Sequence, residues 1–298
     1  MFAIDISKNT IRLLKLKKED SAFVIYGAIE TKFDEIKALK DINIISSAIK
    51  NAMASAKPNP IEDKEVGFSI PEEHSFIKIL NIDNSMPKDK IPGLIEKEIP
   101  YSLDEIYWDY KELGNKKIIF SAAPRKIVDK YIEIASRASL RTVLVETESN
   151  ALIWGSLYLS KIDINKHILV LYIDKNKINI VIWSNNAIQF TTNDKFEYES
   201  ATIKSPNKKD VENLTYRLEK YINFYNEHLR SQSGETQKID KIVLTGIWEN
   251  FLSLKKELTN KIGIPVYGPG RSISINYTYT IALGIALRGM ENTKKNNL

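Results

Sequence analysis

The chain has 298 residues, of which 43% are hydrophobic and 27% are charged, and this composition is typical of a globular protein with two domains. It contains no cysteine, which excludes disulfides, thiolate metal sites and a cysteine nucleophile, and its longest apolar run, residues 168–173, is far shorter than the ~20 residues that span a bilayer. The net charge of +5 comes from lysines and arginines that are interspersed with acidic residues, which argues against a nucleic-acid partner.

The chain opens on a strand, a polar turn and a second strand, in the segment FAIDISKNTIRLLKL at residues 2–16. A looser copy of this unit, ILVLYIDKNKINIVIW, occupies residues 168–183. In both segments, aliphatic and β-branched residues flank a polar turn with Asp, Lys and Asn, which is the pattern of a tight hairpin between half-buried strands. Two such hairpins far apart in one chain predict a duplicated lobe.

Between the hairpins, the sequence predicts a strand at residues 22–29, a helix with apolar residues at helical spacing over 42–53, and an inserted α+β subdomain at residues 65–140. About eighty residues suffice for a compact subdomain of this kind. Its expected elements are two strands around the PEEH turn, a helix from Pro87 to Glu98, the aromatic strand IYWDYKEL, the strand KKIIFSAAP and a helix from Arg125 to Ala138.

After the second hairpin, the sequence predicts a long helix from Lys208, then a buried strand that ends in Thr245-Gly246 and leads into another helix. The last predicted helix, YTYTIALGIALRGM, alternates small and large residues, so Ala282, Gly284 and Ala286 are expected to permit close approach to a neighbouring backbone. This helix is expected to end at Gly289 as its C-cap. The predicted domains are a first lobe at 1–64 and 141–166, the inserted subdomain at 65–140, a second lobe at 167–290 and a flexible tail at 291–298.

Several segments resemble one known family. They are AIDISKNTIRLLKL, EKEIPYSLDEIYWDYKEL, SAAPRKIVDKYIEIASRASLRTVLVETESNALI, KIVLTGIWENFLSL, IGIPV and TIALGIALRG. The chain resembles the PilM proteins of type IV pilus assembly, which are cytoplasmic relatives of the division protein FtsA. The resemblance covers nearly the whole chain. It implies an α/β, actin-like (ribonuclease H-like) two-lobed fold with the α+β subdomain inserted in the first lobe.

Members of this family keep glycine in their phosphate and adenosine loops, because backbone amides must approach the nucleotide without a Cβ in the way. In the first loop, Asp5 keeps the acid that relatives place near the metal, but Ser7 stands at the usual glycine. In the second loop, an ungapped comparison places Tyr172 at the family's Asp and Asp174 at its Gly. A gapped comparison keeps Asp174 as the acid and shortens the turn.

The third loop departs from the family pattern as well, because Thr-Gly-Gly-Gly becomes Thr245-Gly246-Ile247-Trp248. Three altered loops predict that ATP is not held, so we expect no cofactor and no catalytic residue. Binding of ATP with magnesium by the degraded loops stays open. The candidate nucleotide residues are Asp5, Ser7, Lys8, Asn9, Thr10, Asp174, Thr245 and Gly246.

Most of these residues also have an ordinary structural interpretation. Lys8 and Asn9 are common in hairpin turns, and an aspartate at a strand end, such as Asp5, can cap the neighbouring turn. Trp248, at the start of a helix, is expected to pack into the gap between the lobes more readily than to stack on adenine. The three histidines lie in separate elements without ligand spacing, so we predict no metal site.

The resemblance implies a scaffold that binds the short cytoplasmic tail of a PilN-like inner-membrane protein. In the family, that tail lies in a groove between the first lobe and the inserted subdomain. We expect a cytoplasmic protein, since no secretory leader follows Met1, that reaches the inner face of the membrane only through this partner. Candidate lining residues, for which core packing is an equal alternative, are Ile91, Leu94, Ile95, Tyr101, Tyr107, Trp108 and Tyr110.

Other functions stay open at this point. The chain could be an active ATP-binding protein of the actin, FtsA and sugar-kinase superfamily, which would need an intact cleft. An FtsA-like polymer tethered to the membrane would need a C-terminal amphipathic helix, which the tail lacks. The system could build pili, secrete protein or take up DNA, and cytoplasmic pilus motor ATPases are possible further partners.

Overall fold

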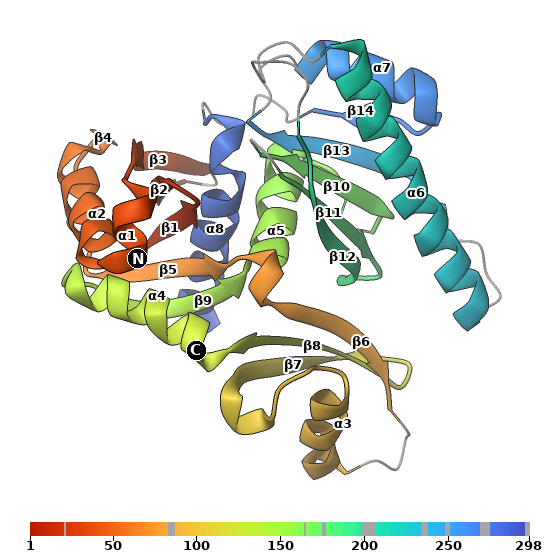
Figure 1. Cartoon of the computed structure of the whole chain (residues 1–298), viewed down its shortest axis with the longest axis horizontal. Helices are drawn as coiled ribbons and strands as arrows, with labels where there is room; N and C mark the ends of the chain where they lie inside the picture. The colour runs from red at the N-terminus through yellow and green to blue at the C-terminus, as the bar shows by residue number, and fades with distance from the viewer. Residues whose placement is uncertain are drawn as a thin grey trace. The chain divides into compact units, whose positions relative to one another are not determined.

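The structure is a computed structural model with two compact units, Met1–Gly155 with Tyr279–Leu298 and Ser156–Thr278 (Figure 1). It describes residues 1–20, 22–82, 87–163, 165–174, 177–197, 207–233, 238–247, 251–268 and 275–295. Within these ranges, no helix is long and apolar enough to cross a membrane.

A six-stranded sheet forms the centre of the first unit, in the order β4-β3-β2-β1-β5-β9. β1, β2 and β3 form the predicted antiparallel meander, whereas β5 and β9 run parallel to β1. β1 and β2 are buried along most of their length, which fits their nearly continuous apolar sequences. The strands are β1 (Phe2–Ser7), β2 (Thr10–Glu19), β3 (Ala22–Lys32), β4 (Lys57–Pro58), β5 (Glu65–Ile70) and β9 (Arg141–Thr147).

Helices cover both faces of this sheet. α2 and α4 pack their apolar stripes on one face, where Val66 and Phe68 of β5 join their core. The residue between these two, Gly67, faces Ile285 of α8 on the other side. Apart from the helix of the inserted subdomain, the helices of this unit are α1 (Glu35–Lys40), α2 (Asn43–Ser55), α4 (Arg125–Arg137), the start of α5 (Glu148–Ser160) and α8 (Thr280–Lys295).

The last helix corrects two predictions. α8 packs against β1, β2, β5 and β9, so it belongs to the first unit and not to the second lobe. It also continues through Gly289 to Lys295, where the sequence predicted a C-cap and a flexible tail. Gly289 serves for close approach, because a Cβ there would lie 2.2 Å from the Met1 sulfur. Gly284 acts similarly against the Ala151 carbonyl of α5, as its small size suggested.

The inserted subdomain is an antiparallel sheet in the order β6-β8-β7 with one helix, α3, against it (Figure 1). It is smaller than the predicted 65–140, because β5 pairs within the large sheet and α4 packs on that sheet. In the sequence, the subdomain therefore begins after β5 and ends before α4. Its elements are a 3-10 turn (Glu72–His74), β6 (Phe76–Asn81), α3 (Ile91–Lys97), β7 (Ile106–Gly114) and β8 (Lys117–Pro124).

The second unit has a five-stranded sheet in the order β12-β11-β10-β13-β14, and α6 and α7 bury their apolar faces against it. β10 and β13 are parallel, as expected for strands that alternate with helices. The elements are β10 (Ile168–Ile173), β11 (Lys177–Ser184), β12 (Ala187–Lys195), α6 (Lys208–Ser233), β13 (Lys241–Gly246), α7 (Phe251–Ile262) and β14 (Val266–Tyr267).

Candidate functional site

The two hairpins predicted as copies have the same register. In the first unit, β1 pairs with β2 so that Asp5 lies opposite Arg12. In the second unit, β10 pairs with β11 so that Tyr172 lies opposite Asn179. In each hairpin this is the third residue pair, counted back from the two-residue turn that joins the strands. The duplication predicted from the sequence is therefore confirmed in the pairing of the strands.

The turns identify the residue that stands for the family's glycine in the second loop. Ser7 and Thr10 close the first turn. The Asp174 amide donates to the Lys177 carbonyl at 2.9 Å and closes the second, whose two central residues, 175 and 176, lie outside the described ranges. Asp174 is thus the counterpart of Ser7, and Tyr172 is the counterpart of Asp5. This agrees with the ungapped comparison.

A row of three charged side chains crosses the first sheet at Asp5. The Arg12 guanidinium donates from Nη1 to Asp5 Oδ2 at 3.1 Å and from Nε to Glu30 Oε2 at 2.7 Å. The side chains of Asp5 and Arg12 are each only 4% exposed. Asp5 therefore already has a cation as its partner, and Arg12 is held between two carboxylates.

Sequence reasoning missed Arg12, although one signal was present. Arg12 is a charged residue in the middle of the apolar run TIRLLKL, and a buried arginine needs a carboxylate partner. The cross-strand pairing Asp5–Arg12–Glu30 depends on the register of three strands, which the sequence did not specify.

The equivalent row of the second unit is uncharged. Tyr172 on β10 lies opposite Asn179 on β11, which lies opposite Asn193 on β12. Tyr172 and Asn179 are fully buried. Neither amide atom of Asn179 has a hydrogen-bond partner in the part of the chain that the structure describes. This row supplies no carboxylate where the first unit has Asp5.

Thr245 and Gly246 lie at the end of β13, beside Tyr172 and Ile173 of β10. Gly246 has φ 111°, and a Cβ there would lie 2.1 Å from the Ile173 carbonyl oxygen. The Ile247 amide donates to that same oxygen at 2.9 Å. The backbone thus requires glycine at 246 whether or not a nucleotide binds. Trp248 lies outside the described residues.

The turn residues of the first loop have structural roles. Lys8 is exposed with φ 47°, an ordinary turn conformation, and the Asn9 carbonyl accepts from the Phe33 amide at 2.9 Å. Within the described ranges, no group of three or more His, Asp or Glu side chains could hold a metal ion. In the first loop the retained acid, Asp5, is paired with Arg12, and Ser7 and Asp174 occupy the positions that the resemblance assigns to glycine.

The candidate partner residues of the insert divide into core and surface. Ile91 and Ile95 are buried in the core of the subdomain, so they cannot line a groove directly. Leu94, Trp108 and Tyr110 are half-buried, and the two aromatic rings stack on each other and pack on that core. Only Tyr101 and Tyr107 are exposed.

Tyr107 links the insert to the first sheet. Its hydroxyl donates to Asp129 Oδ1 of α4 at 3.0 Å, and the Arg125 guanidinium carbon lies 4.2 Å from its ring centroid. α4 in turn packs on β9, the outer strand of the large sheet. The side chain of Glu146 on β9 pairs with Arg288 of α8, so the adjacent Val145 points to the opposite face of the sheet, which α4 covers, whereas Val143 lies at an irregularity of the β5–β9 pairing.

Four exposed apolar residues lie on these three elements. We call this set the edge strip, and its members are Tyr107 on β7 (41% exposed), Ile132 on α4 (37%), and Val143 (40%) and Val145 (39%) on β9. Sequence reasoning missed the last three, because VLV in a strand and an isoleucine in an amphipathic helix are ordinary core patterns.

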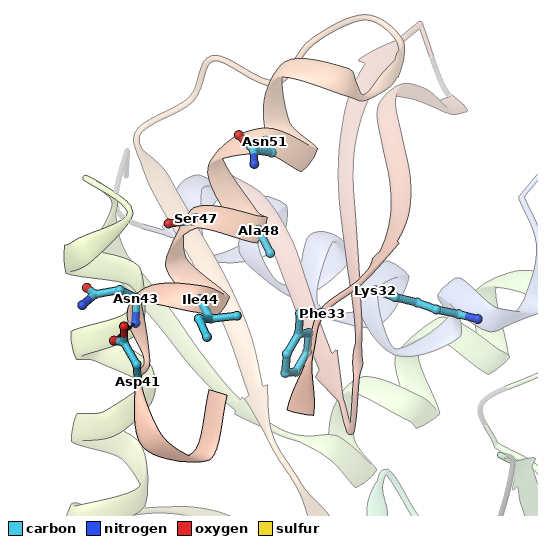
Figure 2. A pocket seen from close by; sticks show the side chains of 8 residues that line it. All are labelled: Lys32, Phe33, Asp41, Asn43, Ile44, Ser47, Ala48 and Asn51. Atoms are coloured by element: carbon cyan, nitrogen blue, oxygen red, sulfur yellow. Dashed lines mark hydrogen bonds between the residues drawn. The ribbon is translucent and has the colours of Figure 1, made fainter. Parts of the chain in front are cut away.

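A separate pocket of about 450 Å³ lies between the end of β3 and α2 (Figure 2). Figure 2 shows Ile44 and Ala48 of α2 on one side and Phe33 on the other. None of the residues predicted from the sequence lines it. The full lining is Lys32, Phe33, Asp41, Asn43, Ile44, Ser47, Ala48 and Asn51.

Comparison with known proteins agrees with this architecture. The sequence matches the family described as "Type IV pilus assembly protein PilM" over residues 3–208. No curated protein sequence matches significantly. Among solved structures, a PilM-PilN type IV pilus biogenesis complex is similar with a TM-score of 0.75 and 14% identity, over 97% of this chain and 98% of that one.

Two further solved structures are similar at lower TM-scores. A Bacteroides thetaiotaomicron protein with an actin-like ATPase fold has a TM-score of 0.52 and 14% identity, over 95% of this chain and 94% of that one. The cytoplasmic domain of EpsL, from the type II secretion system of Vibrio cholerae, has a TM-score of 0.52 and 8% identity, over 96% and 94%. These similarities confirm the predicted actin-like fold.

Proposed function

Because the chain belongs to the PilM family of type IV pilus assembly proteins, we propose that it is a cytoplasmic scaffold that binds the tail of a PilN-like inner-membrane protein. The similar solved structure is a complex of PilM with PilN, which supports this choice of partner. In this proposal, the chain reaches the inner face of the membrane through that partner.

The observation that carries the proposal is the edge strip. Among the described residues, no further strand pairs with the outer edge of β9, so its backbone groups there are available to an extended peptide. Val143 and Val145 offer exposed apolar side chains two residues apart in the sequence, and Ile132 of α4 adds a third. An extended tail with alternating apolar residues matches this arrangement.

Tyr107 defines one end of the binding surface. It is fixed by its contacts with Arg125 and Asp129, so its ring is held in place before a partner arrives. A tail of about ten residues on such a surface commonly binds with micromolar affinity, near −8 kcal/mol, and depends on a few anchors.

We propose further that this role does not require ATP hydrolysis. The paired Asp5, the uncharged row at Tyr172 and the side chains at the glycine positions support this part. The alternative, an active ATP-binding protein of the same superfamily, is favoured only by the retention of Asp5 and of Thr245-Gly246. The backbone requires glycine at position 246 whether or not a nucleotide binds, so its retention is not specific evidence for ATP.

Hydrogen–deuterium exchange can locate the binding surface. The N-terminal peptide of the PilN-like partner should slow amide exchange in β9, because its amides would gain hydrogen bonds. The internal control is β12, the outer strand of the second sheet, which should exchange unchanged. Protection of β12 or the second unit, with β9 unaffected, would move the site away from the edge strip.

A further inference from the structure

We infer that the Arg12 guanidinium occupies the position between Asp5 and Glu30 that a divalent metal ion would need. This inference rests on the ATP-independent part of the proposed function and adds the residue responsible. It does not depend on where the tail binds.

The geometry of the row supports this assignment. Asp5, Arg12 and Glu30 lie on three adjacent strands at directly paired positions, so the backbone ladder holds the two carboxylates on either side of Arg12. Arg12 uses Nη1 for Asp5 and Nε for Glu30, at 3.1 and 2.7 Å. A planar guanidinium can bridge two carboxylates in this way because its donors are fixed in a fork.

Burial restricts the access of a metal ion to Asp5. Arg12 and Asp5 are 4% exposed, while Glu30 is 40% exposed. A metal ion entering from the side of Glu30 would meet the positive guanidinium before it reached Asp5. Without that guanidinium, the two carboxylates would present the hard oxygen ligands that magnesium and manganese prefer.

Two partly buried tyrosines feel the charges of this row. Burial raises the pKa of Tyr279, which lies just before α8, to about 12, and the charges of Glu30 and Arg12 act on this pKa in opposite directions. Burial also raises the pKa of Tyr131, which feels the charge of Asp5. Both phenols are neutral at pH 7, so they add no charge to the row.

The duplicated hairpin provides a comparison within the same chain. The row Tyr172–Asn179–Asn193 has the same register and neither acid nor base. A charged row is therefore not needed to form this hairpin in the fold. In the first unit, Asp5 is present and Arg12 neutralises its charge. The consequence is a first unit that is complete without metal or nucleotide.

The experiment compares the wild-type chain with Arg12→Ser and with Arg12→Ser/Asp5→Asn. Melting temperatures are measured in EDTA and in millimolar MnCl₂, and bound Mn²⁺ is counted by electron paramagnetic resonance. We expect no manganese binding and no shift for the wild type. Arg12→Ser should melt lower in EDTA, bind one Mn²⁺ and recover part of the lost melting temperature. The double variant should lose both responses.

Three outcomes overturn the inference. They are manganese or MgATP binding by the wild type that Arg12→Ser abolishes, absence of any manganese response in Arg12→Ser, and failure of Arg12→Ser to fold even with manganese while the double variant folds. Tail-peptide binding is measured on the same proteins. Loss of the metal response with intact peptide binding contradicts only this inference, whereas absence of peptide binding in the wild type contradicts only the scaffold proposal.

Discussion

The buried pair of Arg12 and Asp5 predicts a large and non-additive effect on stability. Arg12→Met removes the guanidinium and leaves the Asp5 carboxylate, 4% exposed, in the same place. Removing one member of a buried ion pair costs about 3–5 kcal/mol, because the remaining charge keeps its desolvation penalty. Glu30 also loses a partner, but at 40% exposure it stays hydrated and adds only about 0–1 kcal/mol.

Adding Asp5→Asn to Arg12→Met removes the buried charge, so the double variant should recover most of the lost stability. Lys17→Met is the matched control, because Lys17 lies on the same strand with its side chain 60% exposed. A surface change of this kind should alter the free energy of unfolding by no more than about 0.5 kcal/mol.

Urea unfolding in EDTA, followed at the transition of the first unit, measures these differences. For a unit of this size, 1 kcal/mol shifts the melting temperature by about 2–4 °C, so Arg12→Met should melt roughly 6–20 °C lower. The reasoning is refuted if Arg12→Met lies within about 1 kcal/mol of the wild type, or if the double variant is as unstable as the single one.

Three further predictions concern packing and pH. Gly284→Ala would place a Cβ 1.8 Å from the Ala151 carbonyl and should cost about 1–3 kcal/mol or more in unfolding free energy, whereas the control Gly93→Ala meets open space and should be neutral or slightly stabilising; equal effects would contradict the helix contact. Ile95→Ala should destabilise the insert by about 2–5 kcal/mol, seen as faster amide exchange in β6–β8 with the second unit unchanged, and a global loss would show that the insert has no core of its own. Burial raises the pKa of Tyr225 to about 12, so the neutral phenol stabilises the second unit fully below pH ~10, and this contribution is lost as pH rises towards 12; absorbance of tyrosinate should show a late phase that Tyr225→Phe makes smaller, while Tyr279 and Tyr131 account for the rest, and an unchanged titration curve would count against it.

Local patterns were enough to predict much of the fold. The hairpins could be predicted because aliphatic runs around Lys-Asn turns leave few other conformations. Helical spacing similarly predicted α2 and α4, and the small residue Gly284 predicted a close helix contact. These features depend on residues near one another in sequence.

Features that depend on distant contacts were missed. Gly289 near the end of an apolar helix favours a C-cap, but α8 continues through it, and the absence of a Cβ there leaves room for the distant Met1 side chain. The sequence EVGFSI suits the insert as well as the large sheet, and its parallel pairing with β1 and β9 decides between them. Likewise, Ile95 carries the same apolar signal whether it lines a groove or fills the core of a subdomain.

The most direct test of the central claim is a calorimetric titration of the PilN-like N-terminal peptide in EDTA, without nucleotide. The proteins are the wild type, Val145→Asp on the edge strip and Tyr216→Ala, a control at an aromatic residue of the second unit that is 68% exposed. We predict micromolar binding by the wild type and the control, and a loss of about tenfold or more for Val145→Asp. Equal binding by all three, or binding that appears only with MgATP, would contradict a scaffold that holds its partner along β9 without nucleotide.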